Sequence, residues 1–352
     1  MSSRADAGAW ARELGISREA TQLYLDSEVI DLHLDSFIWH RIFGYDLTKR
    51  HDRAPLGGWF LGHADFPRVR SAGLAAATWV ITTNPLREPN DRLDALLRNI
   101  AALTELVRTL PGELALTSTF RDYRAARQAG LHAVFVGIQG GNALEAPNAV
   151  AQLPRGSILR VTLVHLSSSS IGATSSPLRV GPDTGLGAFG KGLVQELEAA
   201  RILVDLAHVG PQGFWDAVAV HDPSLPLVVT HTGVSGVHRH WRNLDDAQLR
   251  AIAESGGVVG VMFHSAFLGD RLWAGRAESV VDHLNHIVRV AGEDCAALGS
   301  DFDGAIVPPR DLTSVLQLPR LVEHMLRRGW SSDRIQKILG RNFLRVLAEV
   351  RP

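Results

Sequence analysis

Eight short apolar runs, rich in valine and isoleucine, recur along the chain and alternate with segments of helical periodicity. Runs that are apolar throughout are typical of parallel strands with both faces buried. The alternation therefore predicts an α/β fold, and eight strand–helix units predict a (β/α)8 TIM barrel. The predicted strands cover 28–35, 75–82, 132–139, 158–165, 201–208, 225–232, 256–264 and 295–302.

An open, doubly wound sheet is the alternative arrangement of such units. Its nucleotide-binding form is disfavoured, because no glycine-rich phosphate fingerprint follows the first predicted strand. We expect a single barrel domain over 1–352, with a helical lead-in over 1–27 and closing helices over 313–352. The expected N-caps of three helices are Asn90, Asn243 and Ser332.

The composition limits the partners and the compartment of the protein. Lys plus Arg is 36 and Asp plus Glu is 37, so no net charge favours nucleic acid or an anionic membrane as a partner. Cys295 is the single cysteine, which excludes an intramolecular disulfide and favours a reducing compartment. The N-terminal segment has mixed charge, and no stretch approaches a membrane span. These features predict a cytoplasmic protein.

Residues that can bind metal follow the predicted strands at their carboxyl ends, where barrel enzymes carry their active sites. His33 and Asp35 flank Leu34, so their side chains share one face of the first strand. Imidazole and carboxylate together suit Zn²⁺ or a related divalent ion, which lowers the pKa of bound water to about 7. The sequence thus predicts a metal-dependent hydrolase. The other residues of this kind are His165, His208, His231 and Asp301.

Two further acids have structural interpretations. Asp205 lies within a predicted strand and is either a partner of a metal-binding histidine or a polar group of the barrel interior. Asp303 follows Asp301 in the motif GSDFDG and is expected to orient its loop.

Five segments carry the most specific motifs: DLHLD (31–35), DFPRVRSAGLAA (65–76), LVDLAHVG (203–210), GSDFDG (299–304) and GRNFLRVL (340–347). Together they resemble the membrane (renal) dipeptidase family, peptidase family M19, among the amidohydrolase-like metal-dependent hydrolases. The resemblance extends from about residue 28 to residue 347. It implies a metallo-dipeptidase that acts on a dipeptide or another small substrate with a free carboxylate. Dimers are common in that family, so the resemblance also allows a homodimer.

The resemblance implies two metal ions. His33 and Asp35 match the ligands of one ion, whereas His208 and His231 match the ligands of the second.

The resemblance also implies three roles in catalysis. Asp301 matches the acid that moves a proton from the attacking water to the leaving amine. His165 matches the residue that contacts the substrate carbonyl and its oxyanion. Arg242 matches the arginine that holds the substrate carboxylate, which a guanidinium can bind bidentately.

Gln139 departs from the family pattern, because the family has a glutamate there that bridges both metal ions. A carboxamide is neutral and offers one oxygen, whereas a bridge needs an anion with two. Losing a unit charge at about 4 Å costs about 4 kcal/mol at an effective dielectric of about 20. This cost corresponds to roughly a thousandfold in affinity. We therefore expect one or two Zn²⁺ ions per chain and favour one.

Two other functions stay open. One is a mono-metal or weakly metallated lyase, isomerase or tailoring enzyme that acts on an amino-acid-derived intermediate. It is suggested by Gln139 and by VMFHSAFL (261–268), where the family often carries asparagine and tyrosine. The other is a non-catalytic binder of small molecules. Metal content separates the three, since two ions favour the dipeptidase, one the rival enzyme and none the binder.

Overall fold

The computed structural model describes residues 6–52, 57–177, 179 and 181–352 of the chain. Within that part, nine strands form one sheet in which the paired strands run parallel. Eight of them follow one another as β1-β2-β4-β5-β6-β7-β8-β9, and β3 pairs with β4. The strands are β1 (Ile30–Leu34), β2 (Ala76–Thr82), β3 (Leu114–Leu116), β4 (His132–Gln139), β5 (Arg160–Thr162), β6 (Leu203–Asp205), β7 (Val228–Thr232), β8 (Val258–Val261) and β9 (Ala296–Leu298).

A seam between the first and last strands closes the sheet into a barrel. Leu34, the last residue of β1, forms a parallel bridge with Phe302, which follows β9. Two backbone hydrogen bonds reinforce it, from Asp35 N to Phe302 O (2.9 Å) and from Asp301 N to His33 O (3.2 Å). The predicted (β/α)8 barrel is therefore confirmed, and the open sheet is wrong.

All eight predicted strands are present, each inside its predicted run and most of them shorter than it. β3 was not predicted, because its three residues are too short to produce an apolar run. His165 and His208 were expected to end their strands, but β5 ends at Thr162 and β6 ends at Asp205. Both histidines therefore belong to loops.

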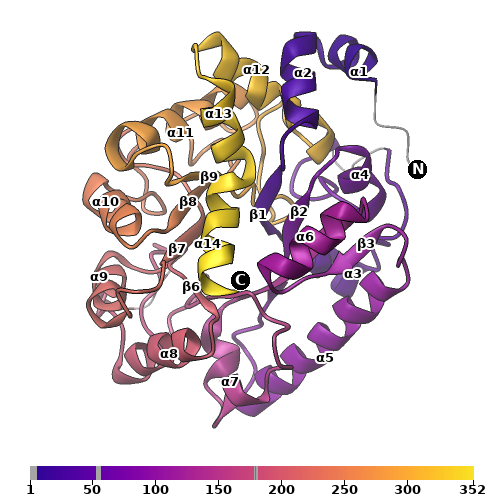
Figure 1. Cartoon of the computed structure of the whole chain (residues 1–352). Coiled ribbons are helices and arrows are strands. Elements are labelled where there is room, and N and C mark those ends of the chain that lie inside the picture. Colours follow the sequence, from indigo (N-terminus) through magenta and orange to yellow (C-terminus); the bar gives the residue numbers. More distant parts are fainter. Residues whose placement is uncertain (1–5, 53–56, 178, 180) are drawn as a thin grey trace.

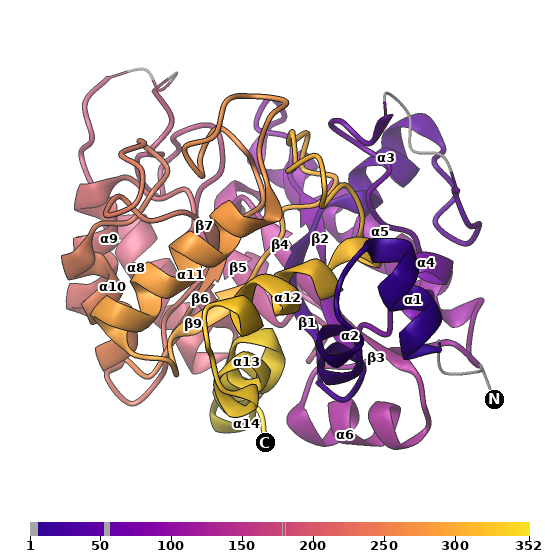
Figure 2. The same ribbon diagram turned by 90° about the horizontal axis from the view of Figure 1, so that it is seen from above.

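Helices surround the barrel (Figure 1), and Figure 2 shows α14 at one end of it and α3, with the long loops, at the other. Within the described residues, no helix combines the length and apolarity that a membrane crossing needs. The helices are α1 (Ala7–Leu14), α2 (Arg18–Leu25), α3 (Ser36–Phe43), α4 (Phe66–Ser71), α5 (Pro89–Arg108), α6 (Phe120–Gln128), η2 (Gly141–Leu144), α7 (Ala149–Gln152), α8 (Ala188–Ala199), α9 (Pro211–Val220), α10 (Asp246–Glu254), α11 (Ala277–Ala291), η3 (Val315–Gln317), α12 (Pro319–Arg327), α13 (Ser332–Gln336), η4 (Lys337–Arg341) and α14 (Asn342–Val350).

The three predicted N-caps are wrong by one or two residues. Glu88 precedes α5, whose first residue is Pro89, because proline suits a position where no N–H is needed. Asp245 caps α10 in a capping box with Gln248, and Ser331 caps α13. The Asn243 side chain instead donates to the carbonyls of His238 and Phe267 and so ties two loops together.

Two buried apolar clusters fix the barrel. The larger one packs the strands against the surrounding helices. The smaller one joins strand residues such as Phe135, Val228 and Val258 to Phe343 and Leu347 of α14. Helix α14 thus covers the end of the barrel opposite the long loops, and the other end is left for polar chemistry (Figure 2).

Candidate functional site

All the predicted site residues lie at the end of the barrel where the strands terminate. His33 and His231 belong to β1 and β7, and Gln139 is the last residue of β4. The others lie in the segments that follow β1, β5, β6, β7 and β9, in the order Asp35, His165, His208, Arg242 and Asp301.

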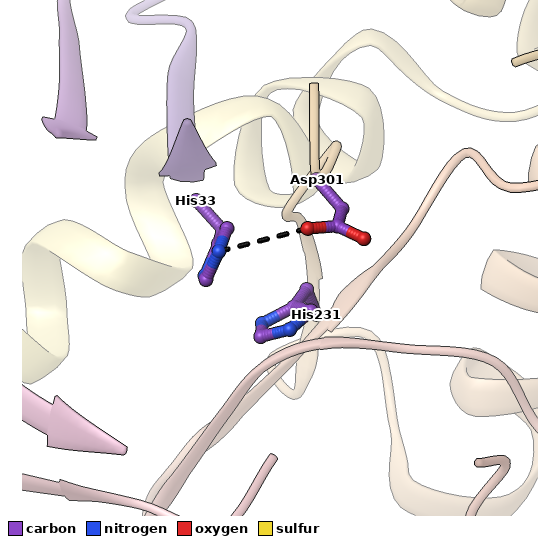
Figure 3. Close-up of side chains that lie close together, drawn as sticks. All are labelled: His33, His231 and Asp301. Carbon is purple, nitrogen blue, oxygen red and sulfur yellow. Dashed lines mark ion pairs between the residues drawn. The ribbon is translucent and has the colours of Figure 1, made fainter. Parts of the chain in front are cut away.

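Three buried residues present ligand atoms that lie within 4.8 Å of one another, namely His33, His231 and Asp301 (Figure 3). His33 Nε2 lies 3.6 Å from Asp301 Oδ1 and 3.3 Å from Asp35 Oδ2. The ring centroids of His33 and His231 are 3.7 Å apart. His33 and His231 come from the two different predicted pairs of ligands, so the structure does not separate the pairs into two distant half-sites, and Asp301, predicted as the catalytic acid, lies beside both.

The remaining histidines and Arg242 adjoin this group. His208 Nε2 lies 2.8 Å from His231 Nε2, and the rings of His165 and His208 meet edge to face with centroids 4.6 Å apart. Arg242 is buried and donates from Nη2 to the carbonyl oxygen of His231 at 2.7 Å. The structure therefore brings together seven of the residues that were predicted for the site, and the eighth, Gln139, lies at the same end of the barrel, although their roles are not tested.

Two site residues have unusual backbone conformations. The φ angles of His208 and Asp301 are 66° and 60°, in the left-handed region that non-glycine residues rarely adopt. Such a residue costs about 1–3 kcal/mol and persists only where its surroundings enforce it. Residues of this kind concentrate at functional sites, so both conformations support a functional interpretation of this end of the barrel.

A buried ion pair inside the barrel supports the histidines. Arg160 Nη1 donates to Asp205 Oδ2 at 2.9 Å, and both side chains are at most 1% exposed. Arg160 Nη2 also donates to Nδ1 of His33 at 2.7 Å. Asp205 accepts hydroxyl hydrogen bonds from Thr162 and Thr230. Asp205 thus combines both roles considered for it, whereas Arg160 was not predicted as part of the site.

These contacts fix which nitrogen of His231 carries the proton. The Thr230 hydroxyl gives its hydrogen to Asp205, so its oxygen accepts from His231 Nδ1, 3.0 Å away. His231 Nε2 therefore presents a lone pair, to which His208 Nε2 donates. This leaves Nδ1 of His208 without a hydrogen-bond partner among the described residues. His231 therefore has one ring nitrogen held by a neighbouring oxygen and the other presenting a lone pair, which is the usual arrangement of a metal-binding histidine.

His33 has the opposite tautomer. Because the Arg160 guanidinium can only donate, Nδ1 of His33 accepts, and the ring proton lies on Nε2 facing Asp35. An ion that binds through His33 Nε2 would therefore have to displace a proton, as metal binding to histidine often does.

Gln139 points into the barrel above Arg160. A Cβ atom added to Gly137 would lie 3.1 Å from Arg160 Nε, so that face of β4 looks inward. Gln139 is two residues further and shares the face. Its side chain is 1% exposed, and Oε1 has no hydrogen-bond partner within the described part of the chain. An unpartnered buried oxygen is costly, so this carboxamide is placed to meet a cation or a ligand.

Burial keeps the histidines neutral. It lowers the pKa of His165 to about 4 and lowers the pKa of His208 and His231 well below the ordinary value. Neutral imidazole is the form that binds metal ions.

The two acids of the site have opposite pKa shifts. Burial, followed by the charge of Asp35, raises the pKa of Asp301 well above its ordinary value, although Arg242 opposes this. Burial also opposes the ionisation of Asp35, but its contacts with His33 and the Thr82 hydroxyl lower its pKa. Asp35 therefore favours the ionised form and Asp301 the protonated form. Such a separation is common where two acids have different catalytic roles.

This donor set fits a divalent transition-metal ion. Neutral imidazoles and carboxylates are the ligands that Zn²⁺ and related ions prefer. The buried Oε1 of Gln139, which has no hydrogen-bond partner among the described residues, is a further oxygen donor at this end of the barrel.

Asp303 is buried and organises the loop that precedes α4. It accepts hydrogen bonds from the backbone N–H groups of Gly62, His63 and Ala64 and from the Ser36 hydroxyl. These contacts agree with the expectation that Asp303 orients a loop.

Comparisons with known proteins give one consistent result. The family model described as membrane dipeptidase (peptidase family M19) matches residues 17–352. An uncharacterized protein in the pqqA 5' region of Klebsiella pneumoniae is 34% identical over 269 residues, covering 74% of this chain and 98% of that protein.

Two solved structures are similar in fold and sequence. Dipeptidase AC, a metallopeptidase of family M19, is 28% identical with a TM-score of 0.79, covering 91% of this chain and 98% of that one. A metallopeptidase from Rhodobacter sphaeroides, solved with a phosphinate mimic of the dipeptide L-Ala-D-Ala, is 26% identical with a TM-score of 0.80. That match covers 92% of this chain and 99% of that one.

Gly137→Ala tests whether the space beside Arg160 is required. The new Cβ would lie 2.9 Å from Thr78 Cγ2 and 3.1 Å from Arg160 Nε, so one of them must move. We expect a loss of about 1–3 kcal/mol in the free energy of unfolding, measured by urea denaturation. The control is Gly192→Ala in α8, where a Cβ meets open space and stability should stay equal or rise by up to about 1 kcal/mol. Equal stability of the two variants would contradict the interpretation.

Proposed function

The chain belongs to the membrane dipeptidase family, peptidase family M19, and is a metal-dependent hydrolase of the dipeptidase type, for which we propose the following division of roles. The observation that carries the proposal is the convergence of His33, His231 and Asp301, with Asp35 and His208 beside them. We propose that His33, Asp35, His208 and His231 hold the metal and that Asp301 acts beside it. A divalent ion bound there would supply Lewis-acid activation of the scissile carbonyl group and of water.

We propose Zn²⁺ as the ion, because it suits a mixed imidazole and carboxylate ligand set. We also propose a cytoplasmic location, which is supported by the single, buried cysteine, Cys295. A homodimer is part of the proposal only through the resemblance to the family.

Arg242 is proposed to bind the carboxylate of the substrate. It is buried, and its Nη2 is already fixed by the carbonyl of His231. Its Nε has no partner within the described residues, so the guanidinium retains donors for a ligand. A planar guanidinium can grip a carboxylate with two parallel hydrogen bonds.

His165 and Asp301 are proposed to act on the reacting atoms. As a neutral imidazole, His165 can donate a hydrogen bond to the carbonyl oxygen as negative charge develops on it. Asp301 accepts the proton of the attacking water as the oxygen bonds to the carbonyl carbon. It then delivers this proton to the amine nitrogen as the C–N bond breaks. Asp301 must be ionised to accept this proton, a form that Arg242 favours and that a bound cation would favour further. Its raised pKa makes the carboxylate a stronger proton acceptor than an ordinary one.

A different reaction on the same scaffold is the second candidate. The observation in its favour is Gln139, which removes a negative charge from the position between the two pairs of ligands. A lyase, isomerase or tailoring enzyme that uses one ion would tolerate that loss better than a two-metal dipeptidase.

The first test is a screen for hydrolysis of dipeptides and N-acyl amino acids with added Zn²⁺, Co²⁺ or Mn²⁺. Turnover of at least one dipeptide is the expected outcome. A fully metallated protein that cleaves none of them would overturn the proposed function.

Asp301→Asn should reduce kcat at least a hundredfold, because the amide cannot accept the proton. The fold should be retained, since asparagine tolerates the left-handed backbone of this position better than most residues. The measurements are dipeptide turnover at saturating Zn²⁺ and the melting temperature. Turnover that excess Zn²⁺ restores would make Asp301 a metal ligand without a role in proton transfer.

Arg242→Lys should raise KM for dipeptides with a free carboxylate at least tenfold more than KM for the corresponding dipeptide amides. Lysine retains the charge but cannot reproduce the bidentate contact. Steady-state kinetics on matched acid and amide substrates provide the measurement. Equal changes for both substrates would remove Arg242 from carboxylate recognition.

Gln139→Glu should increase the number of tightly bound metal ions. We propose that the natural protein holds one ion after dialysis, because only Asp35 and Asp301 of the described carboxyls lie within 4 Å of His33 Nε2, and the nearby Asp31 instead accepts from the backbone of His33 and Ser300. Elemental analysis should show a second ion in the variant, together with higher dipeptidase activity. The matched control is Gln195→Glu on the exposed face of α8.

The outcomes of this substitution are distinct. Two stoichiometric ions in the natural protein would show that the carboxamide suffices and that the charge argument is wrong. A second ion accompanied by loss of the natural activity would favour the one-metal enzyme.

A further inference from the structure

A cavity of about 410 Å³ lies beside the metal centre, between the end of β2, helix α3 and the first half of α5. Thr82 and Thr83 contribute to its wall. Four arginines also line it, which are Arg41, Arg87, Arg92 and Arg98. This concentration contrasts with the balanced charge of the whole chain, which is −1.

Most of the positive charge of this cavity is not neutralised by the protein. Arg92 has 90% of its side chain buried and forms an ion pair with Glu145. Among the described residues, no ion pair involves Arg41, Arg87 or Arg98. Three of the four arginines therefore have no ion-pair partner among the described residues. Arg41 is partly buried, whereas Arg87 and Arg98 are exposed, so solvent screens part of their field.

Hydrogen bonds through Thr82 link the wall of the cavity to Asp35 of the metal centre. Arg41 Nη2 donates to the Thr82 carbonyl oxygen at 3.0 Å, and the Thr82 hydroxyl donates to Asp35 Oδ1 at 2.7 Å. Burial and then the charge of Arg87 lower the pKa of Arg41, although Asp35 opposes this. The guanidinium groups of Arg41 and Arg87 repel each other, and this repulsion is destabilising. An anion between them would offset that cost.

We propose that this cavity binds the anionic group of a small molecule, a carboxylate or a phosphate, at a site separate from Arg242. Arginine matches both groups in geometry, because its planar donors can contact two oxygens at once. The volume is within the range of pockets that hold small ligands. The anion belongs either to an acidic side chain of the substrate or to a free molecule. Only the first of these assignments rests on the proposed dipeptidase function.

Binding is tested by isothermal titration calorimetry at low ionic strength with inorganic phosphate and, separately, with succinate. We expect saturable binding of at least one of them to the natural protein and at least tenfold weaker binding to Arg87→Gln/Arg98→Gln. The matched control is Arg108→Gln/Arg121→Gln, which removes two exposed arginines outside the cavity and should change affinity less than twofold. Absence of saturable binding for both anions, or equal binding by the cavity variant, would overturn the proposal.

Kinetics on the Zn²⁺-loaded enzyme identify the source of the anion. If the cavity holds a substrate side chain, the cavity variant raises KM at least tenfold for a glutamate-containing dipeptide and less than twofold for Ala-Ala. If the anion is free, phosphate or succinate changes the turnover of Ala-Ala by the natural enzyme without competing with it, and the variant loses this response. Failure to cleave any dipeptide would refute the proposed function, but calorimetry would still decide the anion site.

Discussion

The ion pair between Arg160 and Asp205 is the interaction on which the site depends. It lies inside the barrel with almost no exposure to solvent, where an unpaired charge would be strongly destabilising. From this pair, one hydrogen bond reaches His33 directly and another path reaches His231 through Thr230. A single buried contact thus sets the orientation and the proton position of two histidines that come from opposite sides of the centre. Any change that displaces the guanidinium disturbs both.

The fold and the convergence of the site could be predicted to a large extent from the sequence. Buried parallel strands leave continuous apolar runs, and strand alternation places His33 and Asp35 on one face. Arg160 could not be predicted, because a lone cation in a strand gives no local signal and its partners lie 45 and 127 residues away. The left-handed backbone of Asp301 was equally hidden, since aspartate occurs in many conformations. The N-caps were misplaced because polar residues cluster before helices and only geometry selects one.

The charges around the centre explain why one carboxamide matters. Asp205 is neutralised by Arg160, and Arg242 adds a positive charge next to Asp301. Asp35 and Asp301 are the carboxyls next to His33 Nε2, and Gln139 adds no negative charge to them. The proposal of a single ion rests on this charge balance, because each further cation would repel the first.

The seam that closes the barrel determines how much of the chain must be synthesised before the site can form. The backbone of Asp301 donates to His33, and the backbone of Asp35 donates to Phe302, so residues from the two ends of the sheet complete the centre together. During synthesis on the ribosome, a chain that has not yet reached residue 301 lacks both the seam and one of the converging acids. A fragment that ends before residue 301 therefore carries His33 and His231 without the acid that lies beside them, and its sheet has no seam with which to close.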